Sequence, residues 1–281
     1  MFPEHRSSIP IASEAMVQSV QRAVHILREL ATAGPRLGVT ELAARIGVSK
    51  PTVHALLRTL EAEGLVRQER ETNKYLLGSG LLRLGNAYLE TQELRSRTLP
   101  WADALAERTG EAVWVAVLDN DRYVLVVHHV LRRGSGVQIL ELGASIPWNT
   151  CALGKAIVAF LPQQEQEALL QGELARLTGQ SVADPGTLSA QLEEVRRVGY
   201  AQEDQESVLG EAAIASPVFE RHGYLAGAIG IVGPVERLLA DDRQQHAVAV
   251  REVATLLSRE LGAGRGVAWQ ARPENSAPPL P

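Results

Sequence analysis

Five side chains that can donate hydrogen bonds lie close together in the chain near position 50. They are Ser49, Lys50, Thr52, His54 and Arg58. Hydroxyl, imidazole, ammonium and guanidinium groups bind the phosphates of DNA and the base edges in its major groove. These residue types therefore indicate a DNA contact. We expect Lys50 and Arg58 to hold phosphates, and Thr52 and His54 to contact bases.

The segment "GVSKPTVHALLRTL" also predicts the helix that positions these groups. Its apolar residues recur at i, i+3, i+4 and i+7, which is the spacing of one helix face. They are Val53, Leu56, Leu57 and Leu60. Ser49 can cap the first turn, Pro51 is tolerated there because first-turn amides have no helical partner, and Gly64 is expected to end the helix. One face would then hold the helix in a core. The other face would contact DNA or, in the alternative, only solvent.

Two shorter helices and a hairpin are predicted around this segment. The first helix covers 17–34, and the second covers about 40–46 with Thr40 as its N-cap and Gly47 at the following turn. A buried stripe is expected on the first helix at Val17, Val20, Val24, Leu27 and Leu30. Strands at 65–67 and 74–76 flank a polar turn. Two short helices with a tight turn, followed by a hairpin, form a winged helix-turn-helix.

Basic and polar residues elsewhere in this region extend the expected DNA surface. Arg22 lies on the first helix, and the hairpin carries Arg67, Arg70, Asn73 and Lys74. Residues 16–78 hold nine Lys or Arg and six Glu, a balance of +3, although the whole chain has a net charge of −5. Such a separation of charge suits a protein in which one part contacts phosphate.

The remainder of the chain predicts an α+β domain preceded by a connecting helix. The connecting helix is expected at 79–98. Strands are predicted at 112–118, 123–130, 137–142, 200–205, 212–219 and 225–232, and helices at 150–160, 163–170, 188–197 and 241–260. The resulting organisation is a disordered tail at 1–15, a DNA-binding domain at 16–78, a linker helix at 79–98, an effector-binding domain at 99–262 and a second disordered tail at 263–281.

Composition limits the class of protein. The chain has 281 residues, of which 45% are hydrophobic and 22% charged, as in an ordinary folded protein, and the length suits two domains. It has no apolar run near the roughly 18 residues that a membrane span needs, and no signal-peptide core, so a cytoplasmic location is expected. Its single cysteine, Cys151, excludes an internal disulfide. No metal site or cofactor is predicted.

Several blocks of the sequence together resemble the IclR family of bacterial transcription regulators. They are the stretch from "VQSVQRAVHILREL" to "LLGSGLLRLG", then "GASIPWNTCALGKAIVAF", and "VRRVGYAQEDQESVLGEAAIASPVFERHGYLAGAIGIVGPVERL". The resemblance covers about 17–261. It implies a winged helix-turn-helix joined by a helix to a GAF-like effector domain, assembled as a homodimer or homotetramer that binds pseudo-palindromic operator DNA.

Within the family, the chain is most similar to the glycerol operon regulators of actinomycete-type bacteria. The blocks that carry this similarity are "LLRLGNAYLE", "GEAVWVAVL" and "VVHHV". It implies control of genes for glycerol uptake and glycerol kinase, with glycerol or its phosphate as effector.

The resemblance also implies an effector site made from one helix start and several strands. Its residues here are Leu153, Gly154, Glu203, Glu211, Ala213, Gly230 and Val232. Family members that sense small carboxylates carry Cys or Ser where this chain has Ala213, Gly230 and Val232, and this chain adds Glu211. A larger or less charged ligand is therefore expected. The alternative is that these residues only pack the sheet.

The competing hypothesis is an enzyme that uses Cys151 as a nucleophile, activated by a helix start and by His128 or His129. We expect Cys151 instead to be a small core residue. The two histidines must point to opposite faces of one strand, and each is expected to be a satisfied structural residue. Lys155 is expected to be a solvated charge rather than a ligand contact.

Overall fold

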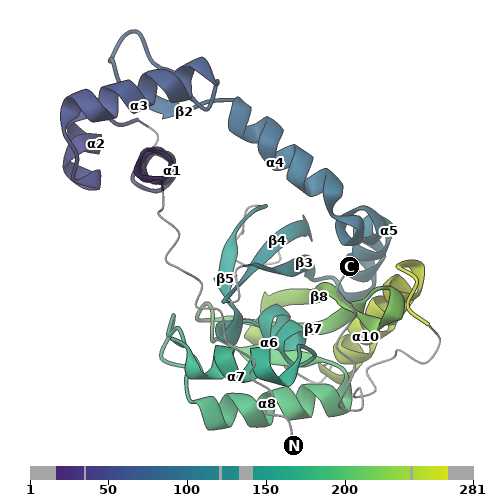
Figure 1. Ribbon diagram of the computed structural model, residues 1–281. Helices are drawn as coiled ribbons and strands as arrows, with labels where there is room; N and C mark the ends of the chain where they lie inside the picture. The colour runs from purple at the N-terminus through teal and green to yellow at the C-terminus, as the bar shows by residue number, and fades with distance from the viewer. Residues whose placement is uncertain (1–16, 35, 120–121, 133–141, 241–242, 265–281) are drawn as a thin grey trace, which may run out of the picture. The chain divides into compact units, whose positions relative to one another are not determined.

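The chain divides into two compact units, Met1–Tyr88 and Leu89–Pro281, and the division falls inside helix α4, Gly80–Thr91. The computed structural model describes residues 17–34, 36–119, 122–132, 142–240 and 243–264 (Figure 1). The predicted tails lie outside these ranges, except for positions 263–264.

The N-terminal unit is a winged helix-turn-helix, as predicted. Its three helices are α1 (Gln18–Thr32), α2 (Val39–Ile46) and α3 (Lys50–Ala62). Strands β1 (Val66–Gln68) and β2 (Tyr75–Leu77) pair antiparallel to form the wing, each shifted by one residue from its predicted position. The buried core joins all these elements and includes Ile26, Leu30, Leu42, Val53, Leu57, Leu60, Val66 and Tyr75.

Two details of this unit differ from the prediction. The stripe predicted on α1 is wrong at its start, because Val17, Val20 and Val24 are 64, 60 and 39% exposed. Ile26 and Leu30 are buried instead, with Ala23 and Leu27 partly buried. Ala23, Ile26, Leu27 and Leu30 also have helical spacing, so packing decides between two apolar faces. Helix α2 begins one residue before the predicted cap, because the Gly38 amide donates to Glu41 Oε2 at 2.6 Å.

The C-terminal unit is built on a six-stranded antiparallel sheet in the order β5-β4-β3-β8-β7-β6. Its strands are β3 (Ala112–Asp119), β4 (Tyr123–Val130), β5 (Ser145–Pro147), β6 (Ala201–Asp204), β7 (Glu211–Phe219) and β8 (Leu225–Pro234). The predicted strand at 137–142 lies outside the described residues except for Leu142, which is in a turn.

Helices cover both faces of this sheet (Figure 1). Helices α5 (Glu93–Thr109) and α10 (Arg243–Glu260) pack on one face. Helices α6 (Ala152–Val158) and α8 (Pro185–Val198) pack on the other, with α7 (Gln163–Gln171) against α8. Val113, Val115 and Val117 of β3 face α5 and α10, whereas Trp114 and Ala116 face α6, as alternation along a strand requires. A one-turn helix, α9 (Val235–Leu238), follows β8.

The helices of this unit also correct the prediction in three places. The predicted connecting helix at 79–98 is interrupted at Gln92, whose backbone is extended (φ −81°, ψ 96°), and α5 then continues to Thr109 as a core helix. A 3-10 turn at Trp148–Thr150 and an extended Cys151 precede α6, so the helix predicted at 150–160 is shorter. Helix α8 begins three residues earlier than predicted, because Asp184 caps it by accepting from Thr187 N–H at 2.7 Å.

Candidate DNA-binding helix and effector pocket

The outward face of α3 is polar and accessible. Lys50, His54 and Arg58 are exposed, and Ser49 Oγ accepts from the Thr52 amide at 3.4 Å. The same oxygen lies 2.8 Å from Thr52 Oγ1, so the Thr52 hydroxyl takes part in the cap. Gly47, with φ +69°, ends α2 in the left-handed region and allows α3 to start in a new direction. On the inner face Val53, Leu57 and Leu60 are buried and Leu56 is partly buried, as predicted.

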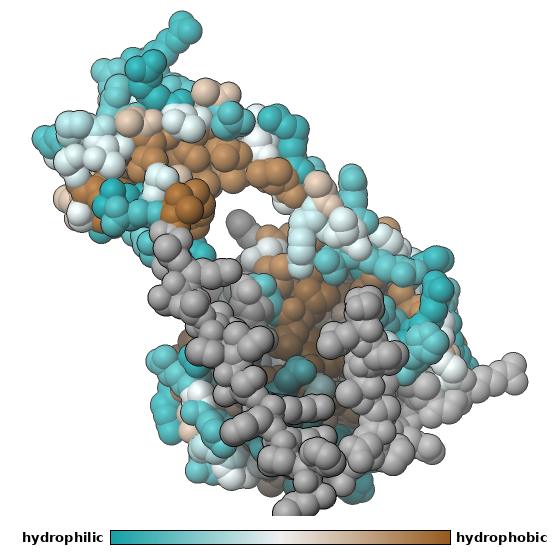
Figure 2. Space-filling view, viewed as in Figure 1, coloured by the Kyte–Doolittle hydropathy of each residue, from teal (hydrophilic) through white to brown (hydrophobic). Residues whose placement is uncertain are grey.

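The wing adds two exposed guanidinium groups, those of Arg67 and Arg70, and Figure 2 shows hydrophilic side chains at its tip. Asn73 has φ 56° and its carbonyl accepts from Gln68 Nε2, so it shapes the turn. Lys74 Nζ lies 3.6 Å from Glu41 Oε2, which offsets part of its charge. Arg22 is half-buried on α1. The described geometry therefore places the most accessible predicted groups on α3 and at the wing.

A cavity of about 280 Å³ lies against the α6 side of the sheet in the C-terminal unit. Its walls are mostly apolar and come from β3, β5, β6, β7, β8, the start of α6 and the loop before α8. They are formed by Trp114, Ser145, Ile146, Pro147, Cys151, Ala152, Leu153, Leu177, Glu203, Ser207, Val208, Glu211, Ala213 and Val232. A concave, mainly apolar cavity with a few polar groups is the usual form of a small-molecule site.

Five of the seven predicted effector residues line this cavity, namely Leu153, Glu203, Glu211, Ala213 and Val232. Gly154 and Gly230 do not. A Cβ at Gly154 would overlap the backbone of Trp148, and a Cβ at Gly230 would lie 2.7 Å from the Cβ of Ala215. These two glycines allow close packing behind the wall. The Gly154 amide is also already used, since it donates to Cys151 Sγ at 3.3 Å.

Sequence analysis missed several wall residues, of which Trp114 is the largest. Its signal was present, because Trp114 pairs with Gly230 across β3 and β8, and a glycine leaves room beside a large ring. Leu177 and Val208 come from loops, whose path the periodicity of the sequence does not predict.

Three ionisable side chains are clustered beside the cavity. Lys155 Nζ lies 2.5 Å from Glu206 Oε1, with side chains only 1 and 6% exposed, so the expectation that Lys155 is solvated is wrong. Glu206 Oε2 also accepts from the Val182 amide at 3.2 Å. Glu203, in the wall, accepts from the Glu206 amide at 2.8 Å. Burial, reinforced by the charge of Glu206, raises the pKa of Glu203 to about 8.

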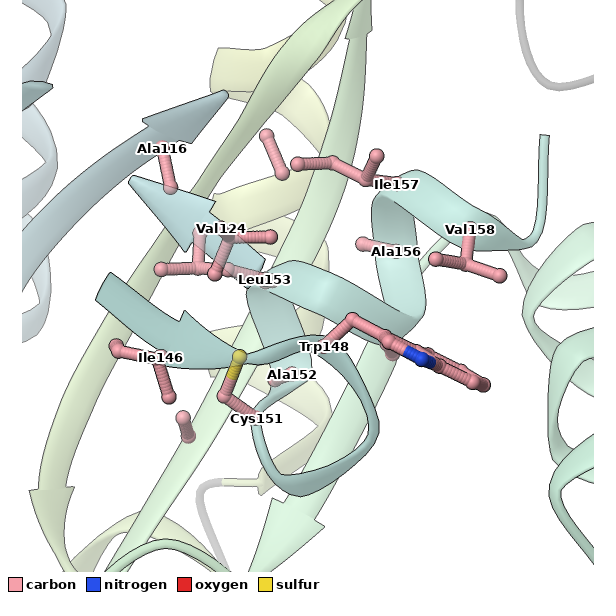
Figure 3. Close-up of a cluster of buried hydrophobic side chains, with 14 of the residues drawn as sticks. Ala116, Val124, Ile146, Trp148, Cys151, Ala152, Leu153, Ala156, Ile157 and Val158 are labelled. Carbon is pink, nitrogen blue, oxygen red and sulfur yellow. The ribbon is translucent and has the colours of Figure 1, made fainter. Parts of the chain in front are cut away.

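Cys151 is a buried wall residue, beside Ile146 and Ala152 in the apolar cluster of Figure 3. Burial raises the pKa of its thiol to about 12, which leaves it protonated and a poor nucleophile. The thiol lies 3.6 Å from the Pro147 carbonyl oxygen, which accepts from it. The environment of Cys151 therefore argues against nucleophilic catalysis.

The two histidines of β4 lie on opposite faces, as expected, since His129 pairs with Trp114 and His128 with Val115. Burial lowers the pKa of His128, and the nearby Arg95 guanidinium lowers it further. The expectation that both are satisfied is wrong for His129, because its buried Nδ1 has no hydrogen-bond partner in the described part of the chain.

Within the described ranges, no group of three or more His, Cys, Asp or Glu could hold a metal ion. Over those same residues, no helix is both long and apolar enough to cross a membrane.

Comparison with known proteins decides the family. The profile "IclR helix-turn-helix domain" matches residues 19–70, and "Bacterial transcriptional regulator IclR C-terminal" matches residues 86–259. The chain belongs to the IclR family. Like the other members, it is a DNA-binding transcription regulator whose C-terminal domain binds a small-molecule effector, so the enzyme hypothesis for Cys151 is wrong.

Individual IclR-family relatives match over most of their length. The chain is 43% identical over 251 residues to the glycerol operon regulatory protein of Streptomyces griseus, which covers 89% of this chain and 98% of the relative. It is 30% identical to the transcriptional repressor IclR of Escherichia coli, over 86% of this chain and 90% of that one. A solved IclR regulator from Alicyclobacillus acidocaldarius has a TM-score of 0.75 at 27% identity, covering 88% of this chain and 99% of the other.

Proposed function

We propose that this regulator controls an operon for glycerol utilisation and responds to glycerol or a phosphate of glycerol. The similarity to the Streptomyces regulator supports this operon. The observation that carries the mechanism is the pairing of two features in one chain, namely an accessible polar helix face in the N-terminal unit and an enclosed cavity in the C-terminal unit. A cytoplasmic location follows from its target, the operator DNA.

The division of labour along the chain follows the same proposal. Residues 16–78 form the DNA-binding domain, 79–98 the connection and 99–262 the effector domain. The DNA contacts are Arg22, Ser49, Lys50, Thr52, His54, Arg58, Arg67, Arg70, Asn73 and Lys74. The N-terminal end of α3 enters the major groove, where helix N-terminal amides and small polar side chains suit phosphates and bases.

The proposed contacts on the effector are Leu153, Glu203, Glu211, Ala213 and Val232, with Gly154 and Gly230 packed directly behind them. The protein works as a homodimer or homotetramer on a pseudo-palindromic operator, with half-sites about 10 base pairs or a multiple apart. Effector binding shifts the population between assemblies with different spacing of the paired α3 helices.

The test is operator binding by the full-length protein, measured by fluorescence anisotropy on the DNA upstream of its neighbouring genes. We expect footprints over inverted repeats beside glycerol facilitator and kinase genes, affinity that falls steeply with salt, and a change in affinity when glycerol or glycerol 3-phosphate is added. Binding that is insensitive to salt would contradict the proposed DNA face. A target operon for aromatic catabolism would contradict the glycerol assignment.

A further inference from the structure

The charged groups around the effector cavity have one sign. Two carboxylates, those of Glu203 and Glu211, lie in the wall, and two serines, Ser145 and Ser207, add hydroxyl groups. No Lys, Arg or His is among the described residues that line it. An anionic ligand would therefore bring its charge into a mainly apolar enclosure with no opposite charge in the wall, and such a charge is costly to bury.

The nearest buried cation does not change this balance. Lys155 is absent from the wall, and its ammonium group lies 2.5 Å from Glu206 Oε1. Glu206 is itself held by the Val182 amide, and its own amide donates to Glu203 Oε2. Turning Lys155 toward a ligand would leave Glu206 buried without its counter-charge, which is strongly unfavourable.

The same groups suit a ligand that carries hydroxyls. Carboxylate oxygens accept hydrogen bonds, and serine hydroxyls both donate and accept. Burial raises the pKa of Glu203 to about 8, so near neutral pH this side chain is mostly a neutral acid that can also donate. One charged carboxylate then remains in the wall, which does not favour a cationic amine as strongly as two would.

We propose that the cavity selects an uncharged short polyol and discriminates against its phosphate ester. This inference rests on the proposed function, because it chooses between the two effectors named there. Glu203 and Glu211 determine the specificity: they bind ligand hydroxyls and repel a phosphate.

Isothermal titration calorimetry with the full-length protein at neutral pH tests this choice. The probes are glycerol, erythritol and xylitol as neutral polyols, glycerol 3-phosphate as the anion, and 2-amino-1,3-propanediol as the cation. We expect at least one polyol to bind about tenfold or more tightly than the anion and the cation, because like charges repel strongly in a poorly solvated site. Equal or tighter binding of glycerol 3-phosphate or the amine would overturn the proposal, as would no polyol binding.

Variants of the wall make the test independent of folding. Glu211→Gln should lower the preference for polyol over glycerol 3-phosphate by about tenfold. Glu165→Gln, an exposed residue of α7, is the matched control and should leave the preference unchanged. Val208→Arg places a guanidinium at a partly exposed wall position and should create binding of glycerol 3-phosphate. An unchanged preference in both wall variants would contradict selection by charge.

The two proposals can fail separately. Polyol binding without binding to a glycerol operator would leave the ligand class standing and refute the operon. Normal operator binding that responds only to glycerol 3-phosphate would support the operon and refute the ligand class.

Discussion

The DNA-binding helix and the effector cavity treat their polar groups in opposite ways. On α3, Lys50, His54 and Arg58 are exposed on the face away from the core. Beside the cavity, Lys155 and Glu206 are buried and bound to each other. The comparison teaches that a surface site can be changed with little cost to the fold, whereas charges at an enclosed site also hold the fold together.

The largest expected effect comes from removing a buried charge. Lys155→Met should destabilise the C-terminal unit by about 3–5 kcal/mol, because Glu206 loses its counter-charge in the interior. Lys50→Met removes the same charge from α3 and should change stability by less than about 0.5 kcal/mol. Urea unfolding of both variants checks the comparison, and similar losses would break it. Restoring stability with Lys155→Met/Glu206→Leu would attribute the loss to the unpaired carboxylate.

Exposed groups should instead affect DNA binding. Lys50→Ala and Arg58→Ala are expected to weaken binding to every DNA sequence and to reduce the salt slope by about 1 each. Substitution of Thr52 or His54 should change the preferred base at particular operator positions, by about 1–3 kcal/mol per base pair. Anisotropy titrations on an operator library separate the two outcomes. If all four variants behaved alike, the division between phosphate and base contacts would be wrong.

A pH effect should distinguish the cavity from the helix. The folded pKa of Glu203, about 8, is above its ordinary value of 4.5, so the folded state holds this proton more tightly than the unfolded chain does. Its contribution to stability is complete below pH 4.5 and is lost as the pH rises through 8. Glu203→Gln lacks this loss, so the variant should gain stability relative to the wild type by at most about 1 kcal/mol per pH unit between these values. Thermal unfolding across that range measures it, with His54→Gln on α3 as the control that shows no matching trend.

The smallest effect is expected at Cys151. Its buried, protonated thiol should react slowly with iodoacetamide in the native protein and rapidly after unfolding. Cys151→Ala should leave operator binding without effector unchanged. Fast alkylation of the native protein would show that the cavity wall opens more readily than its burial indicates.

The fold was largely predictable because most of its elements have strong periodicity. The apolar spacing of α3 and the alternation in β3, β4, β7 and β8 gave their positions to within a few residues. The face of α1 was not predictable, because two apolar stripes overlap on it and only packing against α2 and α3 chooses Ile26 and Leu30. The break at Gln92 has no signal in the side chains around it.

The two sites differed in the same respect. The outward face of α3 lies within one helix, so its residue types and spacing were sufficient. The cavity combines residues about a hundred positions apart, such as Trp114 and Val232, which only the antiparallel order of the sheet brings together. The buried pair of Lys155 and Glu206 was missed because they are 51 residues apart in the sequence and no local pattern links them.

Gly154 has a consequence for how this regulator can evolve. It does not touch the cavity, yet no side chain fits there without displacing Trp148, and with it the segment that carries Cys151 and Leu153 into the wall. Wall positions such as Ala213 can accept new side chains that alter ligand choice while the frame stays intact. Effector specificity can therefore diverge among descendants of this chain one wall residue at a time, provided that the glycine behind the wall is inherited unchanged.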